Sequence, residues 1–161
     1  INQQLTPQEH RRIGFPAGQQ GVDRALSSTG GTIAAMRAIF DGSGRRFSAH
    51  LAGGTHHAFA DRGEGFCVFS DIAVAAHCAL LEQPGAVKRI LIVDLDVHQG
   101  NGNAVLFSGD DRVFTFSMHC AGNFFSRKEE SDLDVEVPVD TGDEAYLERL
   151  HSVVPPLFER V

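Results

Sequence analysis

The first extended pattern of apolar residues lies between Gly21 and Phe40 and has the spacing of a helix. Gly30 and Gly31 interrupt this pattern, and they permit either a break in the helix or close packing against it. The apolar positions that define the pattern are Val22, Leu26, Ile33, Met36 and Ile39. We therefore expect a helix near the start of the chain.

Three short apolar runs predict strands. The first, from Phe47 to Ala52, is closed by Gly53-Gly54 and is typical of a strand that runs into a turn. The second, from Arg89 to Val97, is continuously apolar except at its C-terminal end, a pattern typical of strands buried on both faces of a parallel sheet. The third runs from Arg112 to His119.

Helical patterns alternate with these strands. Ser70 or Asp71 is placed to cap a helix that continues through Leu81, and Pro84-Gly85 ends it. A short helix is expected from Gly100 to Phe107, and a longer one from Thr141 to Val161. In the longer helix Thr141 and Glu144 have the spacing of a capping box, whereas Pro155-Pro156 predicts a kink or a restart.

The alternation of strands and helices predicts an α/β fold with a largely parallel sheet. In such sheets ligands bind at the carboxyl ends of the strands, which is where the candidate chemistry of this chain lies. The 161 residues, 42% hydrophobic and 22% charged, are ordinary for one globular domain. Because the chain starts at Ile1 and stops at Val161 within a predicted helix, we expect a single partial domain over residues 1–161.

Charge and cysteine content narrow the classes of partner. The net charge of −7, without a cluster of basic residues, argues against direct binding of nucleic acid. An acidic surface either attracts a cationic substrate or serves only solubility. Three cysteines without the spacing of a disulfide framework suggest a reducing compartment, and no apolar run approaches the roughly 20 residues that span a bilayer. We expect a cytoplasmic protein without a membrane segment.

Candidate metal ligands end the second predicted strand. Asp94, Asp96 and His98 are two residues apart, so their side chains share one face if the strand stays extended. Carboxylate and imidazole are ligands of zinc, and a catalytic zinc site uses three protein ligands and an open position. The alternative is a strand end with solvated acidic residues and a loop histidine, and the pattern by itself does not decide between the two.

A second cluster, Gly54-Thr55-His56-His57, follows the first predicted strand. Neighbouring residues in a strand point in opposite directions, so the two histidines suit two separate roles in a turn better than joint ligation from a strand. A surface loop is the ordinary alternative for two adjacent histidines. The presence of two such clusters at neighbouring strand ends favours a site.

Taken together, these motifs resemble the zinc-dependent histone deacetylase family of the arginase/deacetylase superfamily, with the bacterial and class IV-like members most similar. The resemblance runs from about Arg11 to the C-terminus. It rests on Gly53-Gly-Thr-His56-His57, Gly65-Phe66-Cys67, Asp94-Leu-Asp96-Val-His98-Gln-Gly100-Asn101-Gly102 and Phe116-Ser117-Met118-His119. It implies a three-layer α/β/α fold. It also implies an enzyme that hydrolyses N-acyl amides of an acyl-lysine peptide or an acetylated small amine.

The resemblance also implies roles for individual residues. Asp96 and His98 are zinc ligands, and His56 and His57 are the paired imidazoles that handle the water and the departing amine. Asp94 orients His56, because carboxylates of this kind fix the tautomer of a histidine. Asn101 stands where some members have an aspartate as the partner of His57, so an imidazolium at His57 is less stabilised here.

The same resemblance places Gly65 and Phe66 along the acyl-lysine tunnel, with Phe125 or Phe124 as the opposing wall and Cys67 nearby. For the two phenylalanines, and equally for Cys67, ordinary core packing is the alternative. A structural potassium ion is implied at Asp94, Ser117 and the backbone carbonyls of Asp96, His98 and Met118. A second cation site is implied at Phe107, Asp110 and Val113.

Two parts of the family's machinery are not identifiable in this sequence: the third zinc ligand, an aspartate, and the tyrosine that stabilises the oxyanion. Tyr146 is the only tyrosine, but its surroundings differ from the family's glycine-rich loop, so it receives no role. Two alternatives to a deacetylase stay open. One is a truncated metal-binding fragment or scaffold, and the other is a manganese ureohydrolase, whose strand reads D-x-H-x-D instead of D-x-D-x-H.

Overall fold

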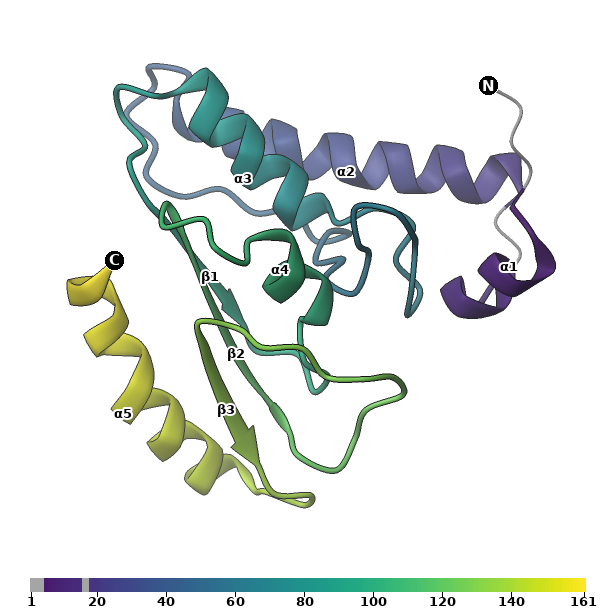
Figure 1. Ribbon diagram of the computed structural model, residues 1–161. Coiled ribbons are helices and arrows are strands. Elements are labelled where there is room, and N and C mark those ends of the chain that lie inside the picture. The colour runs from purple at the N-terminus through teal and green to yellow at the C-terminus, as the bar shows by residue number, and fades with distance from the viewer. Residues whose placement is uncertain (1–4, 16–17) are drawn as a thin grey trace. The chain divides into compact units, whose positions relative to one another are not determined.

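The computed structural model describes residues 5–15 and 18–161, which form helices α1 to α3 followed by strands β1 to β3 with helices α4 and α5 (Figure 1). The chain divides into two compact units, an N-terminal unit, Ile1–Val87, and a C-terminal unit, Lys88–Val161. All strands of the described residues lie in the C-terminal unit. No helix within the described ranges is long and apolar enough to cross a membrane.

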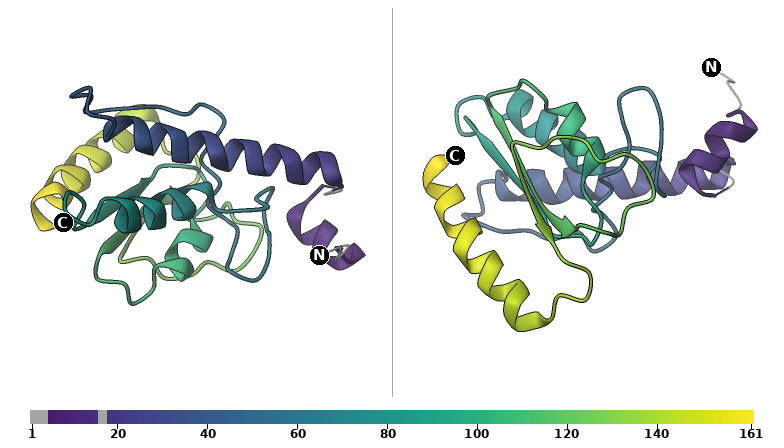
Figure 2. Two further views of the ribbon diagram at one scale, coloured as in Figure 1. Left: turned by 90° about the horizontal axis from the view of Figure 1, so that it is seen from above. Right: turned by 60° about the horizontal axis from the view of Figure 1, so that its bottom comes forward.

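The N-terminal unit is built on two helices that lie side by side, α2 (Gln19–Ile39) and α3 (Asp71–Glu82) (Figures 1 and 2). Arg37 joins them by donating from Nε to Glu82 Oε2 at 2.8 Å. The helix α2 is unbroken through its glycine pair, so close packing is the correct alternative there. A Cβ on Gly31 would lie 2.4 Å from His50 Nε2, so glycine lets that imidazole rest on the helix.

The short helix α1 (Pro7–Ile13) was not predicted, although its start has a clear signal. Thr6 Oγ1 accepts a hydrogen bond from Glu9 N, and the Glu9 carboxylate accepts one from Thr6 N, which is a capping box. The predicted helix from Ser70 or Asp71 to Leu81 is confirmed as α3, with Ser70 as its N-cap.

The predicted strand from Phe47 to Ala52 is wrong. These residues belong to no helix or strand, and both Phe47 and Leu51 are exposed. An apolar run becomes a strand only where another strand offers hydrogen-bond partners, and within the described part of this unit the only ladder is the isolated bridge between Glu64 and Cys67.

The C-terminal unit contains a parallel sheet of three strands in the order β1-β2-β3: β1 (Ile90–Asp94), β2 (Val113–Cys120) and β3 (Leu133–Val137). The predicted parallel α/β fold is therefore confirmed. The helix α4 (Asn101–Leu106) and strand β2 agree with prediction, whereas β3 was not predicted. Its sequence, Leu-Asp-Val-Glu-Val, alternates apolar and acidic residues and lacks the apolar run of a fully buried strand.

One face of this sheet is apolar and is covered by α5 (Asp143–Arg160) (Figure 2). The buried residues between them are Phe116, Met118, Val135, Val137 and Leu157. The opposite face is polar and buried, with Asp94, Thr115, Ser117 and His119 on its strands. The expectation that β1 is buried on both faces is wrong, because Val93 is partly exposed.

The helix α5 differs from prediction in two respects. Gly142 is its N-cap without a side-chain hydrogen bond, and Thr141 Oγ1 instead donates to Pro138 O at 2.7 Å. The helix also continues through Pro155 and Pro156 without a restart.

Candidate active site

The two candidate histidines of the N-terminal unit lie together in the turn that follows Gly53-Gly54. The ring centroids of His56 and His57 are 3.9 Å apart, their planes are inclined by 38°, and both side chains are buried. The turn does not follow a strand, so the expectation of two clusters at neighbouring strand ends is wrong for this one. The backbone of the turn is held instead by the buried carboxylate of Asp71, which accepts hydrogen bonds from Gly54 N and Thr55 N.

The predicted tunnel residues Gly65 and Phe66 form a tight reversal of the chain. Glu64 and Cys67 exchange two backbone hydrogen bonds, at 3.0 and 2.9 Å, and both central residues have positive φ, 53° at Gly65 and 64° at Phe66. These values belong to the two-residue hairpin turn that normally selects glycine or asparagine. A phenylalanine in this conformation is strained, so the backbone of the turn must be held by the surrounding structure, while the Phe66 side chain is 71% exposed.

The end of α1 supplies part of that support. Gly65 N and Phe66 N donate to the carbonyl oxygens of Arg12 and Ile13, at 3.2 and 2.7 Å. Gly14 follows the helix with a φ of 93°, and a Cβ there would lie 2.9 Å from Phe66 Cε1. The helix that was not predicted therefore positions the residue that the resemblance assigns to the substrate tunnel.

The third residue of this motif, Cys67, is buried. Burial raises the pKa of its thiol, although the backbone N–H groups of His57 and His56 act in the opposite direction. The thiol donates to Gly65 O at 3.5 Å. A protonated buried thiol is a packing group and not a nucleophile.

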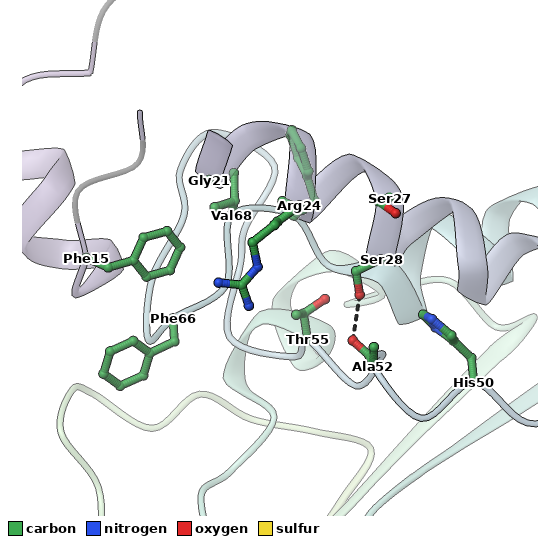
Figure 3. A pocket seen from close by; sticks show the side chains of 12 residues that line it. Phe15, Gly21, Arg24, Ser27, Ser28, His50, Ala52, Thr55, Phe66 and Val68 are labelled. Atoms are coloured by element: carbon green, nitrogen blue, oxygen red, sulfur yellow. Dashed lines mark hydrogen bonds between the residues drawn. The ribbon is translucent and has the colours of Figure 1, made fainter. Parts of the chain in front are cut away.

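A cavity of about 650 Å³ lies beside Phe66 in the N-terminal unit. Figure 3 shows Arg24 extending from α2 toward Phe66 and Thr55 across this space. Its apolar lining includes Phe15, Phe66, Val68 and Phe69. An aromatic wall of this kind suits the aliphatic part of a ligand.

The candidate zinc ligands Asp96 and His98 lie together in the C-terminal unit. Asp96 Oδ1 lies 3.3 Å from His98 Nδ1 and accepts a hydrogen bond from His98 N at 2.8 Å. Strand β1 ends at Asp94, so the extended strand that would align all three side chains is absent. Asp94 is accordingly buried, whereas Asp96 is exposed and His98 is half-buried.

Two further predicted residues flank this segment. The Phe125 ring meets the His98 ring edge-on at a centroid distance of 5.8 Å, and Phe125 is itself exposed, which favours a site wall over core packing. Asn101 is fully buried at the first residue of α4, where its Oδ1 accepts a hydrogen bond from Gly102 N at 3.0 Å.

The predicted potassium ligands lie on the buried polar face of the sheet. Asp94 of β1 and Ser117 of β2 are partners in the parallel register. Ser117 Oγ lies 2.9 Å from His119 Nδ1 and 3.4 Å from Gly100 N. Burial lowers the pKa of His119, while the Asp134 carboxylate acts in the opposite direction.

Asp110 of the predicted second cation site and Tyr146 both contact other groups of the protein. The Asp110 carboxylate binds the Arg112 guanidinium at 2.8 and 2.7 Å, so its charge is already neutralised by a side chain. Tyr146 packs against the apolar face of the sheet, and its hydroxyl donates to Leu95 O at 3.5 Å. This agrees with leaving Tyr146 without a catalytic role.

The donor set of the chain fits part of a zinc site. Asp96 and His98 are close enough to reach one ion, and a carboxylate with an imidazole is a combination that zinc accepts. In the part of the chain that the structure describes, no group of three His, Cys, Asp or Glu side chains is placed to hold a metal. The residues that the structure describes therefore bring together two candidate ligands, whereas a catalytic zinc site uses three.

Comparisons with known proteins show which family carries these motifs. The family model of the histone deacetylase domain matches residues 3–161. An uncharacterized protein of Picosynechococcus sp. is 45% identical over 157 residues, which cover 98% of this chain and 51% of that protein. The histone deacetylase-like amidohydrolase of Pseudomonas aeruginosa is 31% identical over 156 residues, 90% of this chain and 40% of the relative.

A solved structure supports the same family. The crystal structure of a histone deacetylase homologue from Aquifex aeolicus matches with a TM-score of 0.68 and 28% sequence identity, over 84% of this chain and 38% of that one. The chain thus spans about half the length of the Picosynechococcus relative and less of the others.

Proposed function

The chain belongs to the histone deacetylase domain family, and from this premise we propose that the protein is a zinc-dependent amide hydrolase. Its proposed substrates are acetyl or longer acyl groups on lysine side chains or small amines. The observation that carries the proposal is the pair of buried imidazoles, His56 and His57, whose ring centroids are 3.9 Å apart. Two imidazoles buried side by side suit proton transfer to and from a substrate.

Each part of the site has a proposed task. Asp96 and His98 would hold a zinc ion, which when bound polarises an acyl carbonyl and acidifies water. His57 would accept a proton from water and later deliver one to the departing amine, and His56 would hold a proton beside it. Phe66 and Phe125 would border the aliphatic part of the substrate, and Asp94 with Ser117 and the carbonyl of Met118 would bind a potassium ion.

The test is hydrolysis of an acetyl-lysine peptide and of an acetylpolyamine by the full-length gene product, with and without zinc. Activity is expected to require zinc and to be lost in His57→Ala. The matched control is His151→Ala, an exposed histidine of α5, which should keep the activity of the unmodified protein. Full activity in His57→Ala would contradict the proposal.

A metal-binding fragment or scaffold is the competing function, and the absence of a third ligand in the described residues favours it for the 161-residue chain alone. A zinc titration measured by calorimetry distinguishes the hydrolase from the fragment or scaffold. We expect weak binding by the chain alone, lost in Asp96→Ala. Tight stoichiometric binding by the chain would contradict the assignment of only two ligands to it.

A further inference from the structure

The carboxylate of Asp71 is fully buried in the N-terminal unit and joins three segments that are distant in sequence. It accepts hydrogen bonds from Thr55 N at 2.7 Å and from Thr55 Oγ1 at 2.6 Å. Gly54 N lies 3.1 Å from one of its oxygens, and Thr32 Oγ1 of α2 donates to the same oxygen. A buried carboxylate that accepts this many hydrogen bonds binds its donors strongly.

Helix capping does not explain this arrangement. Asp71 is the first residue of α3, but the side chain that caps the helix is Ser70, whose Oγ accepts a hydrogen bond from Ala73 N at 3.2 Å. The Asp71 carboxylate is directed instead at the backbone of residues 54 and 55, which immediately precede His56. The backbone N–H of Asp71 adds a return bond to Thr55 Oγ1 at 2.9 Å.

The glycine before the turn is shaped around the same carboxylate. A Cβ on Gly53 would lie 2.5 Å from Asp71 Oδ2 and 2.7 Å from Thr32 Oγ1. Gly54 has a φ of 97°, a conformation that disfavours other residues. The sequence predicts only a turn at Gly53-Gly54, whereas in the structure the Asp71 carboxylate occupies the space that a side chain on Gly53 would need.

The network continues from the carboxylate to a third histidine. Thr32 Oγ1 lies 2.9 Å from His50 Nδ1, and the His50 ring rests on Gly31. Because the Thr32 hydroxyl donates to Asp71, His50 Nδ1 must be the donor in this contact. The turn is thus connected through Asp71 to a side chain fixed against α2.

We propose that Asp71 is a positioning residue for the paired imidazoles. By holding Gly54 N and Thr55 N, its carboxylate sets the direction in which the backbone enters His56 and so the orientation of both rings. The inference rests on the proposed function, since it assigns Asp71 a part in amide hydrolysis. A displacement of catalytic groups of about 1 Å is enough to lower a rate roughly 100-fold.

The test compares Asp71→Asn with Ser70→Ala. The first keeps the shape of the side chain but removes its charge and introduces N–H groups that face donors. The second removes the N-cap of α3 at the neighbouring residue and leaves the donors of the Asp71 carboxylate unchanged. Long-range ¹H–¹⁵N spectra of the chain report the tautomers of His56 and His57, and steady-state kinetics of the full-length gene product report kcat and KM.

We expect Asp71→Asn to shift the imidazole signals of His56 and His57 and to lower kcat about 100-fold, with KM changed less than about threefold. Ser70→Ala should leave both the signals and kcat unchanged, although it lowers the melting temperature. Equal behaviour of the two variants, with loss of stability alone, would overturn the proposal. If the unmodified protein hydrolyses no acyl amide, the proposed function fails, while the imidazole spectra still test the positioning.

A milder variant covers the case in which Asp71→Asn does not fold. Thr55→Val removes the hydroxyl, which donates to the carboxylate and accepts from Asp71 N, and keeps the bond from Thr55 N to the carboxylate. Thr55→Ser, which retains the hydroxyl, is its conservative control. Smaller shifts of the same imidazole signals in Thr55→Val, with recovery in Thr55→Ser, support the proposal, and unchanged signals in both would contradict it.

Discussion

The His56–His57 turn and the Asp94–His98 segment carry the two sets of proposed functional side chains, and different forces hold them. The turn belongs to no strand, and its backbone is bound by one buried carboxylate, Asp71. The Asp94–His98 segment leaves the end of a parallel strand whose position is set by backbone hydrogen bonds to β2 and by the apolar core beneath the sheet.

The difference predicts how each region responds to substitution. A strand in a ladder keeps its backbone when a side chain changes, because its hydrogen bonds are between main-chain groups. A turn held by one side chain loses several hydrogen bonds at once when that side chain changes. Strand β1 should therefore depend on the packing of the sheet, and the turn on single residues. Beyond the strand, Asp96 N and His98 N donate to the Asp94 and Asp96 carboxylates, so residues 95–98 also depend on single side chains.

Removal of a core side chain should have the largest effect on stability and should act on the C-terminal unit. Leu157 is 3% exposed beneath the sheet, and Leu157→Ala is expected to cost about 3 kcal/mol in free energy of unfolding. Phe158, its neighbour on α5, is 71% exposed, so Phe158→Ala should change this free energy by less than about 0.5 kcal/mol. Urea denaturation measures both, and equal effects would show that α5 does not hold the sheet.

A methyl group placed against the carboxylate should have the next largest effect, and it should act on the turn. Gly53→Ala introduces a Cβ 2.5 Å from Asp71 Oδ2 and is expected to cost about 2 kcal/mol. Its control, Gly85→Ala, meets nothing within 4 Å. Amide hydrogen exchange should accelerate at Gly54 and Thr55 in Gly53→Ala while β1 and β2 stay protected. Uniform acceleration across the chain would contradict a local role.

A charge at residue 101 tests the proposed partner of His57. Asn101→Asp would stabilise an imidazolium at His57, so the base would lose its neutral form at a higher pH than in the unmodified protein. The acidic limb of the pH-rate profile is therefore expected to move upward by about one unit. An unchanged limb would count against the pairing of these two residues.

The smallest expected effect is on the rate of alkylation of Cys67, a residue that we do not expect to affect activity. Because burial raises the pKa of its thiol, little thiolate is present at pH 8, and the thiolate is the reactive form. Mass spectrometry after iodoacetamide treatment should show Cys67 modified more slowly than the half-buried Cys78. In Asp71→Asn the difference should shrink, because a loosened turn uncovers the thiol.

The sequence predicted those elements whose signal is local. The N-cap Ser70 and the apolar runs of β1 and β2 are visible in a few consecutive residues, and each was confirmed. The predicted strand at Phe47 to Ala52 failed because an apolar run carries no information about a pairing partner. Strand β3 was missed although its alternation of apolar and acidic residues is a local strand signal. Its acidic residues face the polar side of the sheet, where Asp134 binds the Gln99 side chain at 2.8 Å.

By itself the sequence supplied the candidate residues of the site, because residue type and spacing are local properties, and the joint occurrence of the motifs resembles one family. The histidine pair and the candidate ligand pair, Asp96 and His98, are readable without a fold. Only the tertiary structure decided how the histidine turn is held. The carboxylate of Asp71 takes its donors from residues 16 and 39 positions away, and burial decides their strength, so no local pattern distinguishes it from a helix cap.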